Sequence, residues 1–181
     1  MTMQKREEFV AIYKKYAQPV YRYCFFRVGS KDLAEELMQE AFIKTWQYIV
    51  GGKKIENIRS FLYQVSRNLI IDYYRQREAK YKKTLSLETI GVETMKNGLA
   101  YEKKDDYEKT DLLREVFSVI GRLPKMYQDL LIMKYVQDLR PKEIANILKA
   151  SNKNVSAKLK RAEKKLNWIL ENSEFGKKVE A

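Results

Sequence analysis

The sequence contains no histidine and only one cysteine, Cys24, among its 181 residues. Histidine-based acid–base catalysis, Cys–His nucleophiles and Cys/His zinc sites are therefore excluded, as is a disulfide within the chain. Cys24 lies among Tyr21, Tyr23, Phe25 and Phe26, which predicts a thiol packed in a core rather than a reactive one. We expect neither a metal site nor a cofactor.

Glycine and long apolar runs are also scarce. The adjacent glycines Gly51 and Gly52 precede Lys53 and Lys54 in an expected loop, and they do not form a Gly-rich phosphate loop. No apolar run approaches membrane-spanning length, and the start, MTMQKREEF, lacks the apolar core of a signal peptide. The sequence predicts a cytoplasmic protein with no membrane insertion and, because no catalytic constellation is present, no enzymatic activity.

Positive charge dominates what is present. The net charge is +12, with 15 basic and 9 acidic side chains in residues 1–80, 6 and 6 in residues 81–110, and 15 and 9 in residues 111–181. Two basic ends therefore flank a neutral centre that is poor in large apolar residues. This distribution favours two modules that bind a polyanion at two points, although many basic proteins have no such ligand.

The segment from Leu123 to Leu170 has the pattern of a helix-turn-helix. Pro124 suits the start of one helix, a break follows at residues 137–140, and Pro141 suits the start of the next. The four residues Lys149–Asn152 then separate that helix from a third one. A turn of three to four residues is the length that this motif uses.

The last helix of this segment is strongly basic. Residues 149–165 contain seven Lys or Arg and a single acid, Glu163. An apolar stripe recurs every three to four residues and is expected to face the core: Val155, Leu159, Ala162, Leu166 and Ile169. The outward side carries Lys153, Ser156, Ala157, Lys160, Arg161 and Lys164. Such a face suits the major groove of DNA; the alternative is a helical bundle with a solvated charged face.

Residues 6–75 predict three or four helices. Pro19 is expected to interrupt the first, and Gly29 to end it. Ser30 or Asp32 can cap the next helix. Its buried stripe is expected to be Ala34, Leu37, Met38, Ala41, Phe42, Thr45 and Ile49. The opposite side, called the acidic face below, carries Asp32, Glu35, Glu36, Gln39, Glu40, Ile43 and Lys44. It suits a basic protein partner, unless its acids only complement the helix dipole.

A further helix is expected to begin after Asn57, which can cap it. Its predicted buried stripe is Ile58, Phe61/Leu62, Val65, Leu69 and Tyr73. The predicted outward face carries Arg59, Tyr63, Arg67, Asn68, Asp72, Arg75 and Arg77. Aromatic and basic groups on one face suit unpaired bases beside a phosphate backbone, although such mixtures also occur on plain surfaces.

With both modules described, the chain resembles a bacterial RNA polymerase sigma factor of the small extracytoplasmic-function (ECF) type. The resemblance is carried by DLAEELMQEAFIKTW (32–46), RSFLYQVSRNLIIDYYRQR (59–77), LPKMYQDLLIMKYVQDLRPKEIANIL (123–148) and NVSAKLKRAEKKL (154–166). These segments occur in the order that the family has, and they span nearly the whole chain except its middle.

The resemblance implies three binding surfaces. The segment 32–46 would bind the β′ clamp helices of core RNA polymerase, through Asp32, Glu36, Gln39, Glu40 and Ile43. The segment 59–77 and the loop before it would bind and open the minus-ten promoter element, through Lys53, Lys54, Asn57, Arg59, Tyr63, Arg67, Asn68, Asp72 and Arg75. The last helix would read minus-thirty-five duplex DNA, through Lys153, Ser156, Ala157, Lys158, Lys160, Arg161 and Lys164. The family also implies an anti-sigma regulator, which nothing in the sequence identifies.

The chain departs from the family pattern at two places in the helix-turn-helix. Lys149 stands where the family usually has a glycine, at a position that often needs a left-handed backbone. Arg140-Pro141 replaces the usual hydroxyl cap of the preceding helix, so that side-chain cap is expected to be lost. The register of residues 150–157 on DNA is therefore open, and so is the promoter sequence.

We predict an all-α fold of two small helical modules joined by a flexible linker. The expected modules are residues 1–77 and 111–172, with a linker at 78–110, a turn of helix within it at 85–90, and a tail at 173–181. The predicted function is a sigma factor that binds core RNA polymerase and promoter DNA. The rival interpretations are a stand-alone helix-turn-helix transcriptional regulator that dimerises through residues 1–75, and a helical RNA-binding protein that uses residues 59–77.

Overall fold

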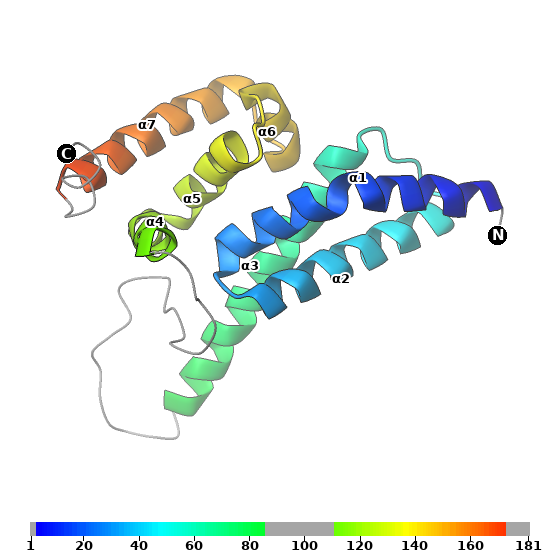
Figure 1. Ribbon diagram of the computed structural model, residues 1–181, viewed down its shortest axis with the longest axis horizontal. Helices are drawn as coiled ribbons and strands as arrows, with labels where there is room; N and C mark the ends of the chain where they lie inside the picture. The colour runs from blue at the N-terminus through cyan, green and yellow to red at the C-terminus, as the bar shows by residue number, and fades with distance from the viewer. Residues whose placement is uncertain (1–2, 86–110, 173–181) are drawn as a thin grey trace. The chain divides into compact units, whose positions relative to one another are not determined.

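All the regular elements in the described part of the chain, residues 3–85 and 111–172, are helices, as the computed structural model shows (Figure 1). They fall into two compact units. The first contains α1 (Met3–Val28), α2 (Lys31–Val50) and α3 (Ile58–Leu85). The second contains α4 (Asp111–Gly121), α5 (Lys125–Leu131), the π-helical turn η1 (Ile132–Val136), most of α6 (Pro141–Leu148), and α7 (Asn152–Glu171). The all-α fold with two helical modules is confirmed.

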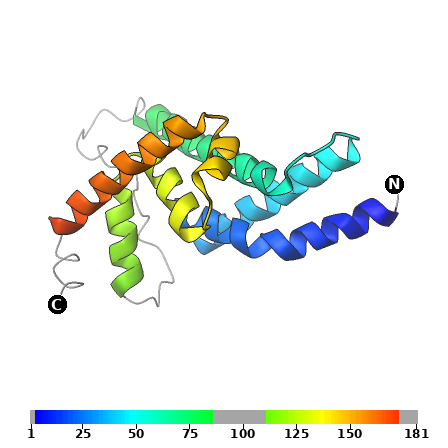
Figure 2. The same ribbon diagram turned by 90° about the horizontal axis from the view of Figure 1, so that it is seen from above.

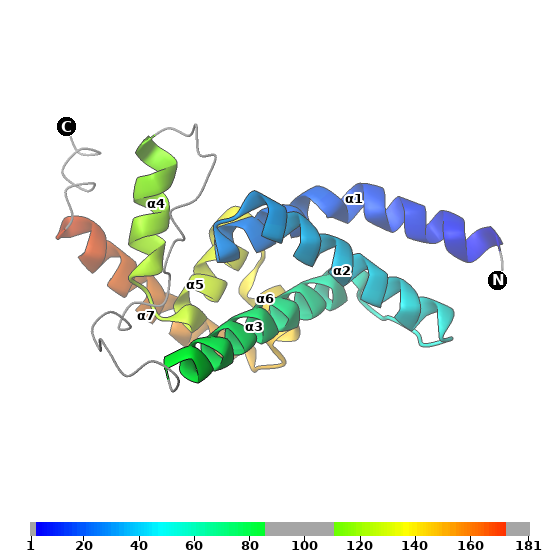
Figure 3. The same ribbon diagram turned by 90° about the horizontal axis from the view of Figure 1, so that it is seen from below.

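Helix α1 runs through Pro19 without a break, so the expected interruption is wrong (Figure 3). A proline inside a helix removes one backbone hydrogen bond and crowds the preceding turn, at a cost of about 3 kcal/mol. The residues that follow, Val20, Tyr23 and Cys24, are each fully buried. Full burial of a large apolar side chain contributes about 1.5–3 kcal/mol, so the packing of the second half of α1 outweighs the lost hydrogen bond.

The ends of the first unit's helices follow from particular side chains. Gly29 adopts a positive φ of 72°, which lets the chain leave α1 and turn back. The hydroxyl of Ser30 accepts a hydrogen bond from the backbone N–H of Leu33 at 3.4 Å, so Ser30 is the N-cap of α2. The side chain of Asn57 accepts one from Ser60 at 2.9 Å, which confirms the predicted cap of α3.

Helix α2 buries the predicted stripe from Ala34 to Thr45, whereas its last predicted member, Ile49, is only half-buried. It packs along α1, and α3 packs against both helices (Figures 1 and 3). The rings of Phe9 and Tyr13 meet the ring of Phe42 with centroids 6.2 Å and 4.8 Å apart. This packing leaves the acidic face of α2 on the side away from the core.

Helix α3 is rotated from the orientation that its apolar pattern predicted. Leu62, Tyr63, Ser66 and Ile70 are buried, whereas Val65 is only half-buried, as are the other predicted stripe residues Ile58, Phe61, Leu69 and Tyr73. Ser66 enters the core because its hydroxyl donates to the carbonyl of Leu62 at 2.8 Å and is satisfied within the helix. The helix continues to Leu85, beyond residue 77. The predicted flexibility and helical turn within residues 86–110 lie outside the described residues.

The second unit has its own apolar core. Val119, Leu123, Leu131, Ala162 and Ile169 are buried together, and Tyr127, Leu166 and Leu170 pack against them. The residues come from α4, α5 and α7 and from the short turn between α4 and α5, so α7 is held along much of its length. Figure 2 shows α7 as one uninterrupted helix. Within the described ranges, no helix is long and apolar enough to cross a membrane.

Candidate functional site

The acidic face of α2 is open to solvent. Asp32, Glu36 and Gln39 are exposed, and Glu40 is half-buried. Ile43 lies at the C-terminal end of this face with half of its surface exposed (50%), which provides an apolar contact beside the charged groups. The predicted exposure of these five residues is therefore confirmed, and none of them is enclosed by the core.

Local interactions on the acidic face are weak. The ammonium group of Lys44 lies 3.1 Å from the carboxylate of Glu40, one helical turn away, and both side chains are nearly half exposed. The amide of Gln39 donates to the carboxylate of Glu35 at 3.2 Å. Exposed i,i+4 ion pairs contribute only about 0.3–0.5 kcal/mol. A basic partner can therefore replace these contacts at little cost.

The loop between α2 and α3 presents two exposed lysines beside aromatic rings. The ammonium group of Lys53 lies over the ring of Tyr48, 5.1 Å from its centroid, and Lys54 is also exposed. The rings of Tyr48 and Phe61 are 4.7 Å apart. Asn57 is exposed, but its side-chain oxygen is occupied as the cap of α3. Of the predicted loop residues, Lys53 thus lies beside an aromatic pair that the sequence reasoning missed.

The predicted outward face of α3 is only partly open. Asn68, Asp72 and Arg75 are exposed, and Arg59 and Arg67 are half-buried. The carboxylate of Asp72 lies 3.6 Å from the guanidinium group of Arg75. Asn68, Asp72 and Arg75 share one side of the helix and could face a strand of nucleic acid. Arg59, seven residues before buried Ser66, lies instead on the side of the helix that packs.

Tyr63 does not belong to this exposed face, so its assignment as a DNA-binding residue is wrong. Only 1% of its surface is exposed, and its ring packs edge-on against Tyr23, with centroids 5.4 Å apart. Burial raises the pKa of Tyr63 to about 12 against the opposing effect of Arg59. The apolar body of a tyrosine can fill a core while its hydroxyl meets a polar group, and the sequence pattern could not distinguish this use from stacking on bases.

The turn between α6 and α7 contains three residues, since α7 begins at Asn152 rather than after it. Lys149 adopts a positive φ of 50°, the left-handed conformation that its position in the motif predicted. The backbone N–H of Ala150 donates to the carbonyl of Ala145 at 3.0 Å, and that of Lys149 donates to Asn146 at 3.4 Å. These two bonds form a Schellman motif, which normally uses glycine at the left-handed position.

Helix α7 begins with a side-chain cap and carries the predicted basic face. The hydroxyl of Ser151 accepts a hydrogen bond from the backbone N–H of Asn154 at 3.2 Å. The side chains of Lys153, Ala157, Lys160, Arg161 and Lys164 are exposed, and Ser156 and Lys158 are half-buried. On the opposite side, the predicted apolar stripe is confirmed as the buried face. The core contacts of α7 therefore determine which of its side chains face outward.

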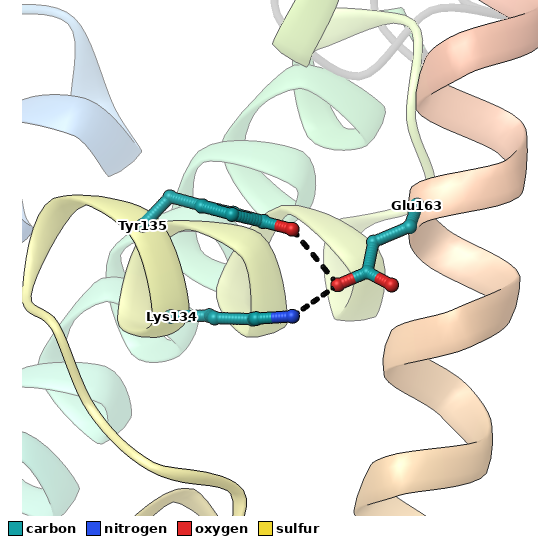
Figure 4. A network of polar contacts seen from close by, with 3 residues as sticks. All are labelled: Lys134, Tyr135 and Glu163. Atoms are coloured by element: carbon teal, nitrogen blue, oxygen red, sulfur yellow. Dashed lines mark hydrogen bonds and ion pairs between the residues drawn. The ribbon is translucent and has the colours of Figure 1, made fainter.

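A polar network that the sequence reasoning missed joins η1 to α7 (Figure 4). One carboxylate oxygen of Glu163 accepts hydrogen bonds from the ammonium group of Lys134 at 2.5 Å and from the hydroxyl of Tyr135 at 2.9 Å. The hydrogen bond from Lys134 is the main reason that the pKa of Glu163 is lowered, and the same bond raises the pKa of Lys134. The only signal in the sequence was that Glu163 is the one acid among the seven basic residues of positions 149–165.

Within residues 3–85 and 111–172, no three His, Cys, Asp or Glu side chains are grouped as ligands for an ion. The charged surfaces that the described residues expose are one acidic helix face in the first unit, a polar and basic side of α3 with the loop before it, and a basic helix face in the second unit.

Comparison with protein families gives two matches. Residues 12–80 match Sigma-70 region 2, and residues 113–166 match Sigma-70, region 4. The first match contains the acidic face and the exposed side of α3, and the second contains the helix-turn-helix.

Several curated proteins are similar over most of the chain. The ECF RNA polymerase sigma factor SigM of Bacillus subtilis (strain 168) is 29% identical over 158 residues, which cover 87% of the chain and 92% of SigM. The ECF RNA polymerase sigma factor SigW of the same organism is 26% identical over 166 residues, covering 89% of the chain and 88% of SigW.

Solved structures share the fold at low sequence identity. The sigma factor RpoE in complex with the anti-sigma factor NepR from Bartonella quintana matches with a TM-score of 0.66 and 16% identity, over 91% of this chain and 98% of RpoE. CnrH in complex with the cytosolic domain of CnrY matches with a TM-score of 0.68 and 16% identity, over 93% of this chain and 91% of that one.

Proposed function

Because the chain belongs to the extracytoplasmic-function group of RNA polymerase sigma factors, which direct promoter recognition, we propose a division of labour among its surfaces. The acidic face of α2 binds core polymerase. The exposed side of α3 with the loop before it binds the minus-ten element, and the basic face of α7 binds the minus-thirty-five element.

The observation that carries this proposal is the exposed acidic face on a chain of net charge +12. Glu36 and Glu40 repel a phosphate backbone, so this surface is unsuited to DNA and suited to a basic protein. Half-exposed Ile43 adds an apolar contact beside these acids, of the kind that protein interfaces use. The β′ clamp helices of core polymerase are the proposed partner.

The exposed side of α3 and the loop at residues 51–57 suit single-stranded DNA at the minus-ten element. Lys53, Lys54 and Arg75 supply exposed positive charge, and Asn68 and Asp72 supply polar groups for base edges. Tyr63 is excluded from this role because it is buried. The aromatic pair Tyr48 and Phe61 lies beside Lys53, where an unstacked base would find a π surface.

The basic face of α7 suits duplex DNA at the minus-thirty-five element. The helix is fixed to its unit by its buried stripe, so Lys160, Arg161 and Lys164 point outward together. Arginine can contact guanine through two hydrogen bonds, and lysine binds phosphates as a point charge. We assign base contacts to the neighbourhood of Arg161, and phosphate contacts to Lys153, Lys158 and Lys164.

The protein itself performs no bond chemistry in this proposal, because the polymerase synthesises the RNA. It acts in the cytoplasm, where polymerase and promoter are present. The sigma factor RpoE is complexed with an anti-sigma factor in its structure, and by analogy we propose that an anti-sigma factor controls access to these surfaces.

The test is a charge reversal of the acidic face, Glu36→Lys with Glu40→Lys. We expect this variant to keep its helical circular dichroism and to lose retention on immobilised core polymerase. The matched control is Glu7→Lys with Glu8→Lys, which makes the same change of charge at two exposed acids of α1. Normal retention of the Glu36/Glu40 variant would contradict the assignment. Run-off transcription from genomic DNA with and without the protein then identifies the promoter.

A further inference from the structure

The helix assigned to duplex DNA is tied to η1 by a single acidic side chain. Glu163 of α7 accepts hydrogen bonds from two adjacent residues of η1, the ammonium group of Lys134 and the hydroxyl of Tyr135 (Figure 4). About a third of each charged side chain remains exposed, 35% for Lys134 and 28% for Glu163. This network is therefore at the surface of the second unit rather than in its core.

The position of Glu163 on α7 places the network at the edge of the basic face. At about 100° per residue, Glu163 lies one turn from Lys160 and two turns from Ser156, both of which are on the DNA-facing side. Lys160 precedes Glu163 by one helical turn, and its charge helps to lower the pKa of that carboxyl. Lys134 thus lies beside the DNA-facing residues, although it comes from another element.

We propose that Glu163 is a specificity-determining residue that withdraws the Lys134 ammonium group from the DNA backbone and fixes α7 against η1. This inference rests on the proposed role of α7 as the duplex-binding helix. A lysine left free at the edge of the groove adds attraction to any phosphate, whatever the base sequence. By pairing with Lys134, Glu163 leaves recognition to the side chains that α7 itself presents, among them Lys160 and Arg161.

The hydroxyl of Tyr135 is a second donor to Glu163, so the carboxylate both balances the charge of Lys134 and fixes the orientation of α7. Tyr135 is exposed, and its hydroxyl shares the same carboxylate oxygen as Lys134. Two donors from consecutive residues of η1 hold the carboxylate from two directions, which restricts the rotation of α7 about its axis. A neutral glutamine can still accept hydrogen bonds but no longer attracts the ammonium group of Lys134 strongly.

The experiment uses the full-length variant Glu163→Gln assembled with core polymerase. Binding is measured over a series of salt concentrations, on a duplex that contains the promoter found by run-off transcription and on one with a scrambled minus-thirty-five element. We expect the slope of log K against log salt to steepen by about 0.9, the value for one additional phosphate contact. The new phosphate contact strengthens both duplexes equally, so it leaves the ratio of specific to non-specific affinity unchanged. That ratio should fall several-fold for a separate reason: α7 is held less firmly against η1, and its base-contacting side chains are positioned less accurately.

Two further variants make this result decisive. Glu171→Gln removes an exposed acid from the end of the same helix and is the control for net charge; its slope and specificity ratio should stay close to those of the original protein. Lys134→Met combined with Glu163→Gln should return the slope to the original value. Lys134→Met alone should leave the slope unchanged, because the proposal keeps this lysine away from phosphate.

The inference is overturned if Glu163→Gln and Glu171→Gln give the same slope and the same specificity ratio. It is also overturned if Lys134→Met alone reduces the slope by about 0.9, which would place Lys134 on the backbone in the original protein. If Lys160→Ala with Arg161→Ala leaves binding unchanged, the assignment of α7 to duplex DNA fails. The role of Glu163 fails separately if Lys160→Ala with Arg161→Ala weakens duplex binding while Glu163→Gln changes neither the slope nor the specificity ratio.

Discussion

The carboxylate of Glu143 accepts a hydrogen bond from the backbone N–H of Arg140 at 2.9 Å, in the first turn of α6. Arg140 precedes Pro141, and its side chain supplies no hydroxyl to cap the helix. Glu143 is the third residue of α6, so this contact is one half of a capping box, the half in which the acidic side chain reaches back to the cap residue. The guanidinium group of Arg140 also lies 3.5 Å from the same carboxylate.

This contact predicts that Glu143→Ala lowers the stability of the second unit. The expected loss is about 0.5–2 kcal/mol, the range for removal of a helix N-cap. Glu143→Gln should lose less, because its side-chain oxygen can still accept from the backbone N–H. The free energy of unfolding in urea, followed by circular dichroism, measures both variants. Equal losses for Ala and Gln would mean that the charge of Glu143, rather than its hydrogen bond, stabilises the helix.

The left-handed Lys149 gives a second prediction, of the opposite sign. The left-handed conformation costs a residue with a Cβ about 1–2 kcal/mol in the folded protein. Glycine avoids this cost, but it loses more conformational entropy on folding, which offsets part of the gain. We expect Lys149→Gly to raise the free energy of unfolding by about 0.5–1 kcal/mol. Lys142→Gly is the matched control, because it removes the same charge from a regular helical position of α6 and should destabilise by about 1 kcal/mol. Destabilisation by both would show that the turn is not strained.

The buried Cys24 predicts a loss of stability in alkali. Burial raises the pKa of its thiol to about 12, whereas an unfolded cysteine titrates near 8.5. A raised folded pKa means that the stabilising contribution is complete below the unfolded pKa and is lost as the pH rises. Relative to Cys24→Ala, the protein should lose about 2 kcal/mol of stability between pH 8 and pH 10. An unchanged difference between the two proteins across this range would refute the burial of a neutral thiol.

How much of this structure the sequence predicts depends on the kind of contact. The buried stripes of α2 and α7 consist mainly of apolar residues at helical spacing, and both are confirmed except at Ile49 and Leu166, which are half-buried. The orientation of α3 was predicted wrongly for two reasons. Its buried side includes Ser66, whose hydroxyl donates to a carbonyl of the same helix, and Tyr63, which the pattern predicted as a surface aromatic residue. Residue type alone does not reveal either use.

The sequence pattern could not predict contacts between residues that are far apart in the chain. Lys134 and Glu163 are 29 residues apart, and they meet because η1 and α7 belong to one packed unit. The turn at Lys149 shows the converse: its left-handed backbone was predictable from a local motif. The acidic face was predicted for the same local reason, since every residue on it lies within a few turns of one helix.

The basic face of α7 predicts that Lys160→Ala and Arg161→Ala each weaken binding to the promoter duplex. The expected loss is about 1–3 kcal/mol for each base contact removed. Arg122→Ala, at an exposed position between α4 and α5, is the control for the loss of one positive charge. Affinity is compared on the promoter duplex and on a scrambled one at constant salt. No change with Lys160→Ala or Arg161→Ala would mean that another face of the unit binds DNA.

The pair Lys134–Glu163 predicts a dependence of stability on pH whose sign follows from the two pKa shifts. The pKa of Glu163 is lowered by its hydrogen bond from Lys134, so its contribution is present above the ordinary carboxyl pKa of about 4.3 and is lost as the pH falls through the lowered value. The pKa of Lys134 is raised, so its contribution persists until the pH rises above about 10.4. Because both side chains are partly exposed, the pair contributes about 0.5–1 kcal/mol.

The measurement is the difference in unfolding free energy between the original protein and Glu163→Gln, taken at pH 3, pH 7 and pH 9. We expect the same difference at pH 7 and pH 9, because the carboxylate stays ionised and the ammonium group stays protonated at both. At pH 3 the difference should shrink, because this pH is below the ordinary carboxyl pKa and the unfolded chain binds a proton more readily than the folded pair does. A difference that stays constant down to pH 3 would show that glutamate stabilises α7 by packing and neutral hydrogen bonding, and that the charge of Glu163 does not hold Lys134.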